Sequence, residues 1–163
     1  MSDSSNPLAD LTPEELRAAG DGRDAVRCFR LILYLGQRLR YLADRRLRGQ
    51  GLTSQQGFLL TVVRMRGRPT LGEVAAAMST THQNVKQIAV ALERKGMVRF
   101  VADEGDARIR RLAPTEAGER GWEDRKAGDF AAIADWFAGL SADEQESMAG
   151  LLARLAGSIR EAG

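Results

Sequence analysis

The sequence predicts a mainly α-helical fold with one small β-hairpin. Two observations support this fold class. Apolar residues recur at the spacing of a helix face over most of the chain, and helix-capping signals separate these stretches. Residues 97–112 differ, because β-forming residues there flank a cluster of turn residues.

The first part of the chain is expected to supply a tail and two helices. Residues 1–11 lack apolar periodicity and predict a disordered tail. Thr12 before Pro13 marks a helix start, and the glycines that follow end this short helix. Residues 23–48 contain no proline, and their apolar stripe is wider than a one-sided surface helix needs. We therefore expect residues 12–48 to belong to a dimerisation domain.

Residues 52–113 have the outline of a winged helix-turn-helix. Three helices in close succession are each preceded by a capping signal, namely Thr53 with Gln56, Thr70 with Glu73, and Thr81. The third helix ends before Gly96. Residues 97–101 and 108–112 then predict two strands around a turn. A hairpin directly after a helix-turn-helix is a wing.

Residues 114–163 predict two long helices. The first begins at Thr115 or Glu116, and the second follows a capping box formed by Ser141 and Glu144. Their apolar stripes exceed what a small winged helix must cover. Because exposed apolar faces of that length usually find a partner, we expect these helices to join residues 12–48 in an intersubunit bundle.

Composition narrows the function classes. The sequence shows no apolar stretch of membrane-spanning length and no signal-type N-terminus, which predicts a cytoplasmic protein with no membrane partner. One cysteine, Cys28, and one histidine, His82, predict neither a disulfide nor a zinc cluster. With no Gly-rich phosphate loop and no paired carboxylates beside a nucleophile, we expect no enzyme, no cofactor and no metal.

Charge is divided along the chain, although the net charge is only +2. Residues 23–48 hold eight Arg against two Asp, and residues 61–111 hold ten Lys and Arg against five acidic residues. Residues 116–163 have five basic against ten acidic residues. The basic middle could face a polyanion, although ordinary solvated faces explain so modest a bias equally well.

Residues 81–95 predict a helix with two different faces. One face is apolar, with Val85, Ile88, Ala89 and Leu92. The opposite face is rich in amides and cations. Gln and Asn can make bidentate contacts to adenine, and Lys can donate to guanine or to phosphate. Any one of these side chains could merely solvate the helix start. As a set they predict a recognition helix.

The hairpin supplies arginines. Asp103, Asp106 and Arg108 form a D-x-x-D-x-R pattern, followed by Arg110 and Arg111. An arginine at a hairpin tip can enter a minor groove, and a nearby carboxylate can hold it extended. Alternation predicts that Arg108 and Arg110 share one strand face. The alternative is a charged hairpin whose arginines only keep it soluble.

The candidate DNA-binding residues come from the helix-turn-helix and the hairpin. They are Thr70, Thr80, Thr81, His82, Gln83, Asn84, Lys86, Gln87, Arg108 and Arg110.

The order of helices, the segments TLGEVAAAM and MSTTHQNVKQIAVALERKGMV, the D-x-x-D-x-R pattern and the closing LAPTEAG resemble the MarR family of bacterial winged-helix transcription regulators. The resemblance covers about residues 24–160. It implies a homodimer on palindromic double-stranded DNA, acting as a repressor released by a small molecule. The segment from Asp106 to Leu112 is shorter than in many members, and Ala113 stands where Thr is common, so Arg108 and Arg110 could exchange roles.

The resemblance also suggests two modes of control. Many members bind small anionic aromatic compounds, and Tyr34, Arg38 and Tyr41 at helical spacing could receive one, although a packed interface explains them equally well. In some members a cysteine of the first helix senses peroxide, so Cys28 could make the chain a redox-sensing regulator. A lone cysteine on an apolar helix face is more often a small core residue. A winged-helix module that binds protein instead of DNA is the other alternative.

Overall fold

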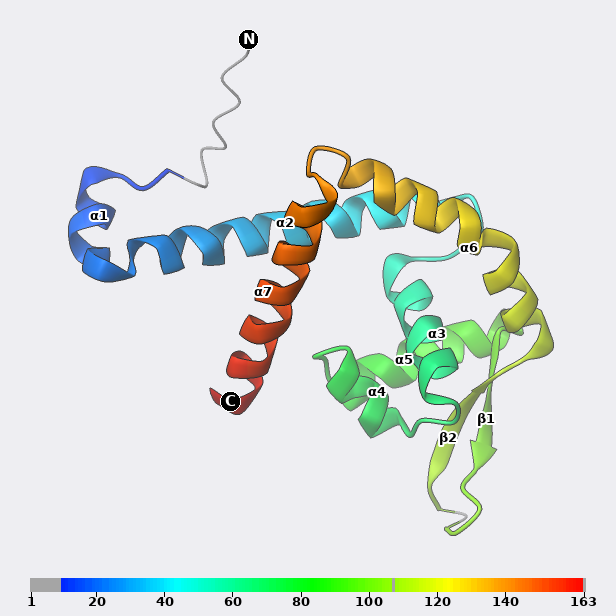
Figure 1. The fold of residues 1–163 in the computed structure, drawn as a ribbon. Helices are drawn as coiled ribbons and strands as arrows, with labels where there is room; N and C mark the ends of the chain where they lie inside the picture. The colour runs from blue at the N-terminus through cyan, green and yellow to red at the C-terminus, as the bar shows by residue number, and fades with distance from the viewer. Residues whose placement is uncertain (1–9, 107, 163) are drawn as a thin grey trace. The chain divides into compact units, whose positions relative to one another are not determined.

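The computed structural model describes residues 10–106 and 108–162, with side chains placed up to residue 159 (Figure 1). Most of the predicted tail therefore lies outside the described residues. The order of elements is α1 (Pro13–Ala19), a 3-10 turn (Gly20–Gly22), α2 (Arg23–Arg48), α3 (Ser54–Arg66), α4 (Leu71–Ala77), α5 (His82–Arg94), β1 (Val98–Ala102), β2 (Arg110–Pro114), α6 (Glu116–Trp136) and α7 (Ala142–Ala162). The mainly helical fold class with one hairpin is confirmed.

The predicted capping boxes form and fix where the helices begin. The Thr53 hydroxyl accepts from the Gln56 N–H at 3.2 Å, and the Gln56 side chain accepts from the Thr53 N–H at 3.2 Å. Ser141 and Glu144 form the same reciprocal pair before α7. Each box satisfies backbone donors that the first helical turn leaves without a partner.

The chain divides into two compact units that join between Pro114 and Thr115. In the first unit, α3, α4, α5 and the hairpin enclose the hydrophobic core. Its largest fully buried side chains are Leu59, Leu60, Val63, Val74, Val85, Leu92, Val98 and Leu112. The predicted apolar face of α5 is buried throughout. Because this face is fixed in the core, the opposite face of the same helix must face outward.

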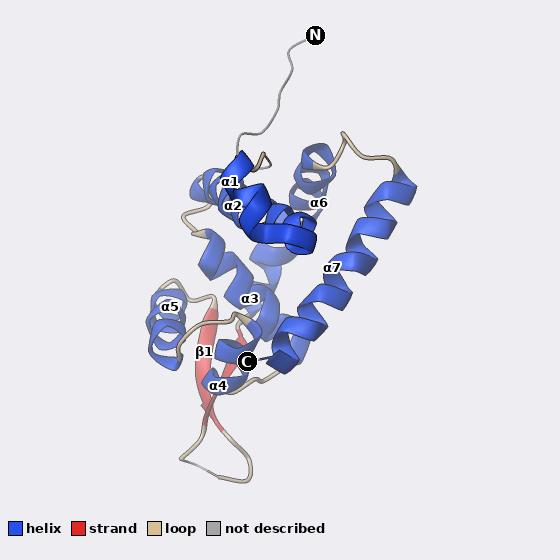
Figure 2. Cartoon of the chain, turned by 90° about the vertical axis from the view of Figure 1, so that its left-hand side faces the viewer, coloured by secondary structure: helices blue, strands red, loops and turns tan. Residues whose placement is uncertain are grey.

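The hairpin is longer at its turn than the sequence predicted. Strands β1 and β2 pair antiparallel from Val98 opposite Pro114 to Ala102 opposite Arg110. The predicted second strand, residues 108–112, was wrong by two residues, and Arg108 lies in the turn. Figure 2 shows the hairpin projecting beyond α4 and α5 of the same unit, with the turn at its far end.

The second unit contains α6 and α7. Thr115 caps α6 by accepting from the Gly118 N–H at 3.0 Å. Large apolar side chains of both helices are exposed in the single chain, among them Phe130, Ile133, Leu151, Leu152, Leu155 and Ile159. Helix α2 likewise exposes Phe29, Ile32, Leu33, Tyr34 and Leu35. None of the helices in the described part of the chain has both the length and the apolar character needed to cross a bilayer.

Candidate nucleic-acid interface

Helix α5 presents its polar face because its start is fixed. The Thr81 hydroxyl accepts from the Asn84 N–H at 3.2 Å and so caps the helix. Four of the predicted contact residues in the first two turns are then exposed, namely His82, Gln83, Lys86 and Gln87. Their donors and acceptors are open to a partner, while the buried face holds the helix in place.

Two of the predicted residues bond to each other in front of α5. The Asn84 side-chain amide donates to the Thr80 hydroxyl at 3.0 Å, and both residues are only half-exposed. The turn before them contains Ser79 at a positive φ of 48°. Thr80 and Asn84 therefore help to fix this turn.

Thr70 lies at the start of α4. Its hydroxyl accepts from the Glu73 N–H at 3.2 Å, and the Glu73 carboxylate accepts from the Thr70 N–H at 2.6 Å. Hydrogen bonds to the Glu73 carboxylate from the Thr70 backbone N–H and then from the Thr70 side chain hold the pKa of Glu73 below its ordinary value, and the nearby Arg111 adds to the effect. The Glu73 carboxylate is therefore ionised at neutral pH.

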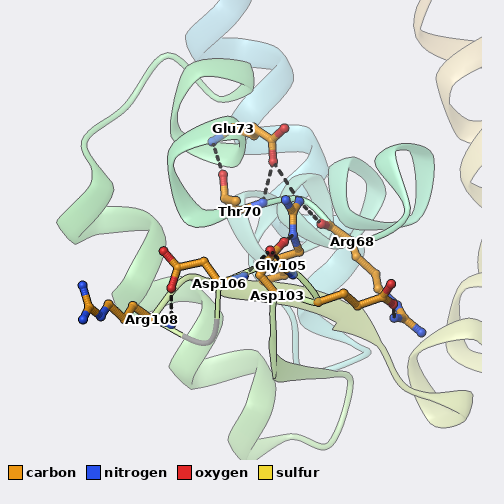
Figure 3. Close-up of polar contacts among 9 residues, drawn as sticks. Arg68, Thr70, Glu73, Asp103, Gly105, Asp106 and Arg108 are labelled. Atoms are coloured by element: carbon orange, nitrogen blue, oxygen red, sulfur yellow. Dashed lines mark hydrogen bonds and ion pairs between the residues drawn. The ribbon is translucent and has the colours of Figure 1, made fainter.

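The positions of the hairpin arginines differ from the prediction. Arg108 precedes β2 and Arg110 begins it, so the two do not share a strand face. The Asp106 carboxylate accepts from the backbone N–H of Arg108 at 2.9 Å and not from its guanidinium. Figure 3 shows the Arg108 side chain extending away from the neighbouring polar cluster. Both arginines are exposed.

The carboxylate predicted to pair with a tip arginine pairs with Arg111 instead. Asp103 forms an ion pair with the Arg111 side chain, and its other oxygen accepts from the N–H groups of Gly105 at 2.9 Å and Asp106 at 3.1 Å. The Arg111 guanidinium, followed by these backbone donors, holds the pKa of Asp103 below its ordinary value. The same pair raises the pKa of Arg111. Sequence spacing alone did not indicate this partner.

A concavity of about 520 Å³ lies between α5, the start of α4 and the hairpin. It brings together five of the predicted residues, namely Thr70, His82, Lys86, Arg108 and Arg110. Thr80, Thr81, Gln83, Asn84 and Gln87 do not line it. Among the described residues, the lining of the concavity thus includes three Lys and Arg side chains and a histidine, and no acidic residue.

Apolar side chains also line this concavity. Phe100 and Ile109, which the sequence did not mark as site residues, line it together with Val90. Ile109 stands between Arg108 and Arg110 and is exposed, so an apolar residue within a basic turn was the signal that could have identified it. Apolar contact with sugar or with a thymine methyl group is the chemistry available to such residues.

The residues suggested for control lie on α2. Tyr34, Arg38 and Tyr41 are all exposed, and the Arg38 guanidinium lies 5.4 Å from the centroid of the Tyr41 ring. They do not line the concavity described above. Cys28 is exposed in the single chain, so its interpretation as a core residue of the chain was wrong. Within the described residues, no group of three His, Cys, Asp or Glu side chains could hold a metal ion.

Known proteins resemble this chain in sequence and in fold. Residues 50–109 match the sequence model of the MarR family. The chain is 30% identical over 105 residues to the transcriptional activatory protein BadR of Rhodopseudomonas palustris, which covers 61% of this chain and 58% of BadR. It is 29% identical over 107 residues to the HTH-type transcriptional repressor MdtR of Bacillus subtilis, which covers 66% of this chain and 69% of MdtR. Both relatives are transcription regulators and not enzymes.

Solved structures agree. A probable transcriptional regulator from Pseudomonas aeruginosa is 26% identical, with a TM-score of 0.70 over 77% of this chain and 93% of that one. The Staphylococcus aureus MepR–DNA complex has a TM-score of 0.70 at 23% identity, over 79% of this chain and 95% of MepR. Helix order, wing and sequence match thus agree: residues 50–109 match the MarR family, and the chain has the winged-helix fold of these solved structures.

Proposed function

We propose that this chain is a sequence-specific double-stranded DNA-binding transcription regulator that acts in the cytoplasm as a homodimer. The concavity between α5 and the hairpin is the observation that supports it most directly. A helix in the major groove and a hairpin in the neighbouring minor groove have one strand of the DNA backbone between them. Here the space between helix and hairpin is lined by His82, Lys86, Arg108 and Arg110. A sugar-phosphate backbone is the polyanion that such a lining suits.

The residues divide by role in this proposal. Gln83 and Gln87, exposed outside the concavity, read base edges in the major groove. Thr81 borders them at the helix start. Thr70, His82 and Lys86 contact phosphate, and Arg108 or Arg110 enters the minor groove. Thr80 and Asn84 hold the turn in front of the helix. Relatives of this fold have been solved with DNA, among them MepR and a mutant of the E. coli MarR protein complexed with operator DNA.

The dimer is supported by the apolar side chains exposed on α2, α6 and α7. Faces of this extent are unusual on a monomeric soluble protein, and a second copy would cover them. We propose that residues 12–48 and 114–163 form the dimerisation domain. A twofold dimer would place its two recognition helices on half-sites about one DNA turn apart, so the operator is palindromic.

We further propose that the chain is a repressor released by a small anionic aromatic ligand, with Tyr34, Arg38 and Tyr41 as its contacts. MdtR is named a transcriptional repressor, which supports repression, whereas BadR is named a transcriptional activatory protein. A reporter fused to the bound promoter distinguishes repression from activation. If the protein is a repressor, expression of the reporter should rise when the gene for this protein is deleted. A releasing ligand should raise the melting temperature and weaken DNA binding, and Arg38→Ala should abolish both effects.

Control through Cys28 is the alternative, supported by its exposure on α2. In that case Cys28→Ser binds DNA normally but no longer releases it when peroxide is added. An unchanged response to peroxide, or no response in the wild type, excludes this mode of control.

The test of DNA binding is a selection of genomic fragments, followed by anisotropy titration of the selected fragment and a random duplex at physiological salt. We expect a clear preference for the selected DNA and a palindromic motif. Replacing Gln83, Lys86 and Gln87 together by Ala should remove the preference. Arg120→Ala on α6, which also removes an exposed cation, is the matched control and should change little. Equal binding to both duplexes by a folded dimer would exclude the proposal and favour a protein-binding module.

A further inference from the structure

Arg111 is a hairpin arginine whose side chain turns back onto the helix-turn-helix. Its Nη1 donates to the Arg68 carbonyl oxygen at 2.8 Å, in the loop before α4. The same atom lies 3.6 Å from a carboxylate oxygen of Glu73 in the first turn of α4. Its Nε bonds to Asp103 at the end of β1. One guanidinium therefore joins the hairpin, the loop and the helix (Figure 3 shows the cluster).

Backbone contacts also attach the start of β2 to the residues just before α4. Arg111 forms an isolated antiparallel bridge with Thr70, and the Leu112 N–H donates to the Pro69 carbonyl at 2.8 Å. Because Thr70 also caps α4, the strand is attached to the helix start that lines the concavity. The start of β2, next to the turn, is thus attached to the loop before α4.

Asp103 extends this attachment to the turn. One of its oxygens bonds to Arg111, and the other accepts from the backbone of Gly105 and Asp106. The Asp103 N–H donates to the Ile109 carbonyl at 3.0 Å, which closes the turn. Arg108 lies in this turn and Arg110 begins β2, so both stand beside the residues that Asp103 holds.

The charges around Arg111 distinguish it from Arg108 and Arg110. Asp103 and Glu73 both lie against its guanidinium, and its side chain is 31% exposed. A phosphate would have to compete with these two carboxylates. Arg108 and Arg110 are exposed on the concavity that suits a phosphate backbone.

We propose that Asp103 and Arg111 form a positioning pair, which sets the direction of the hairpin against α5 so that DNA affinity depends on both residues although neither contacts DNA. This inference rests on the proposed function, because DNA binding is its readout. Arg111 acts on DNA binding through the position of the hairpin, whereas Arg108 and Arg110 contact the DNA.

Asp103→Asn separates this role from a direct phosphate contact by the sign of its effect. If Arg111 contacted phosphate, removing the competing negative charge would strengthen binding. If the pair positions the hairpin, the same substitution weakens binding, although the protein becomes more positive. Glu104→Gln is the matched control. It removes a neighbouring acidic charge whose side chain is 92% exposed and whose ion pair with Arg68, at 3.2 Å, is a surface pair of little expected energy. It should leave affinity unchanged or slightly raised.

The experiment titrates the full chain against its selected operator and a scrambled duplex at several salt concentrations. We expect Asp103→Asn and Arg111→Gln each to lower operator affinity by about tenfold, as is usual for groups coupled in one network. In a protein that already has Arg108→Ala and Arg110→Ala, neither should have a further effect. The magnitude of the slope of log affinity against log salt should fall in Asp103→Asn by about 0.9 for each hairpin arginine whose charge no longer neutralises the DNA.

Three results would overturn the inference: tighter or unchanged binding by Asp103→Asn, losses that add fully in the Arg108→Ala, Arg110→Ala background, or an unchanged salt slope. Unfolding curves identify variants that lose the fold. If the Arg111→Gln variant does not fold, the Asp103→Asn variant, whose side chain has nearly the same shape, still tests the inference. A wild-type protein that does not prefer its operator would refute the proposed function instead.

Discussion

Leu47 of α2 packs against the bare backbone of Gly57 on α3, where an added Cβ atom would lie 2.8 Å from the Leu47 Cδ1 atom. Leu47 is also the buried residue of α2. The long helix therefore meets the core of the winged helix at a contact where a side chain larger than that of glycine would displace Leu47.

We expect Gly57→Ala to destabilise the fold for this reason. Alanine improves helix propensity by about 1 kcal/mol, but crowding a packed core costs about 1–3 kcal/mol. The free energy of unfolding by urea should fall by about 1 kcal/mol. In a Leu47→Ala background, where the crowding is relieved, the same substitution should stabilise. Gly72→Ala, whose Cβ would meet only an ordinary contact at 3.9 Å, is the control. Equal effects in both backgrounds would contradict the account.

Ser79→Gly should stabilise the turn between α4 and α5. Ser79 has a φ of 48°, in the left-handed region that costs a residue with a side chain about 1–2 kcal/mol. Because glycine also makes the unfolded chain more flexible, we expect a net gain of about 0.5–1 kcal/mol in thermal unfolding. Ser79→Ala keeps the strain and should bring no gain. A loss of stability in Ser79→Gly would show that the Ser79 side chain has a role of its own.

The ion pair between Glu15 and Arg30 should make the attachment of α1 to α2 sensitive to acid. Hydrogen bonds from Arg30, then from Thr12, lower the pKa of Glu15 to about 2. Because the pKa is lowered, the ion pair contributes fully to the stability of the fold at pH values above the ordinary pKa of 4.5. This contribution is lost as the pH falls toward 2. A carboxyl titration by NMR measures this directly. Arg30→Gln should move the midpoint back toward the ordinary value, and a Glu15 midpoint near 4.5 in the wild type would refute the pair.

The sequence was sufficient to predict where the capped helices begin. Thr12, Thr53, Thr70, Thr81 and Ser141 each cap a helix where the pattern placed one, because a capping signal is a local interaction between residues three apart. The buried and exposed faces of α5 also follow from local periodicity.

The hairpin was not predicted as well, for a physical reason. Its register depends on the length of the turn and on the bridge between Thr70 and Arg111, which are forty-one positions apart. Period-two alternation cannot fix such a register, so Arg108 was placed on a strand it does not reach. The same long-range bridge gave Asp103 a partner that spacing could not indicate.

Discrimination by α5 is the central claim, and the ratio of Kd values for scrambled and selected duplexes tests it most directly. For the wild type this ratio should reach at least about 10³ at physiological salt. Replacing Gln83 and Gln87 by Ala should lower the ratio by about tenfold or more for the lost base contacts, while binding to the scrambled duplex stays the same. A wild-type ratio near one, or a ratio that the two substitutions leave unchanged, would contradict the account.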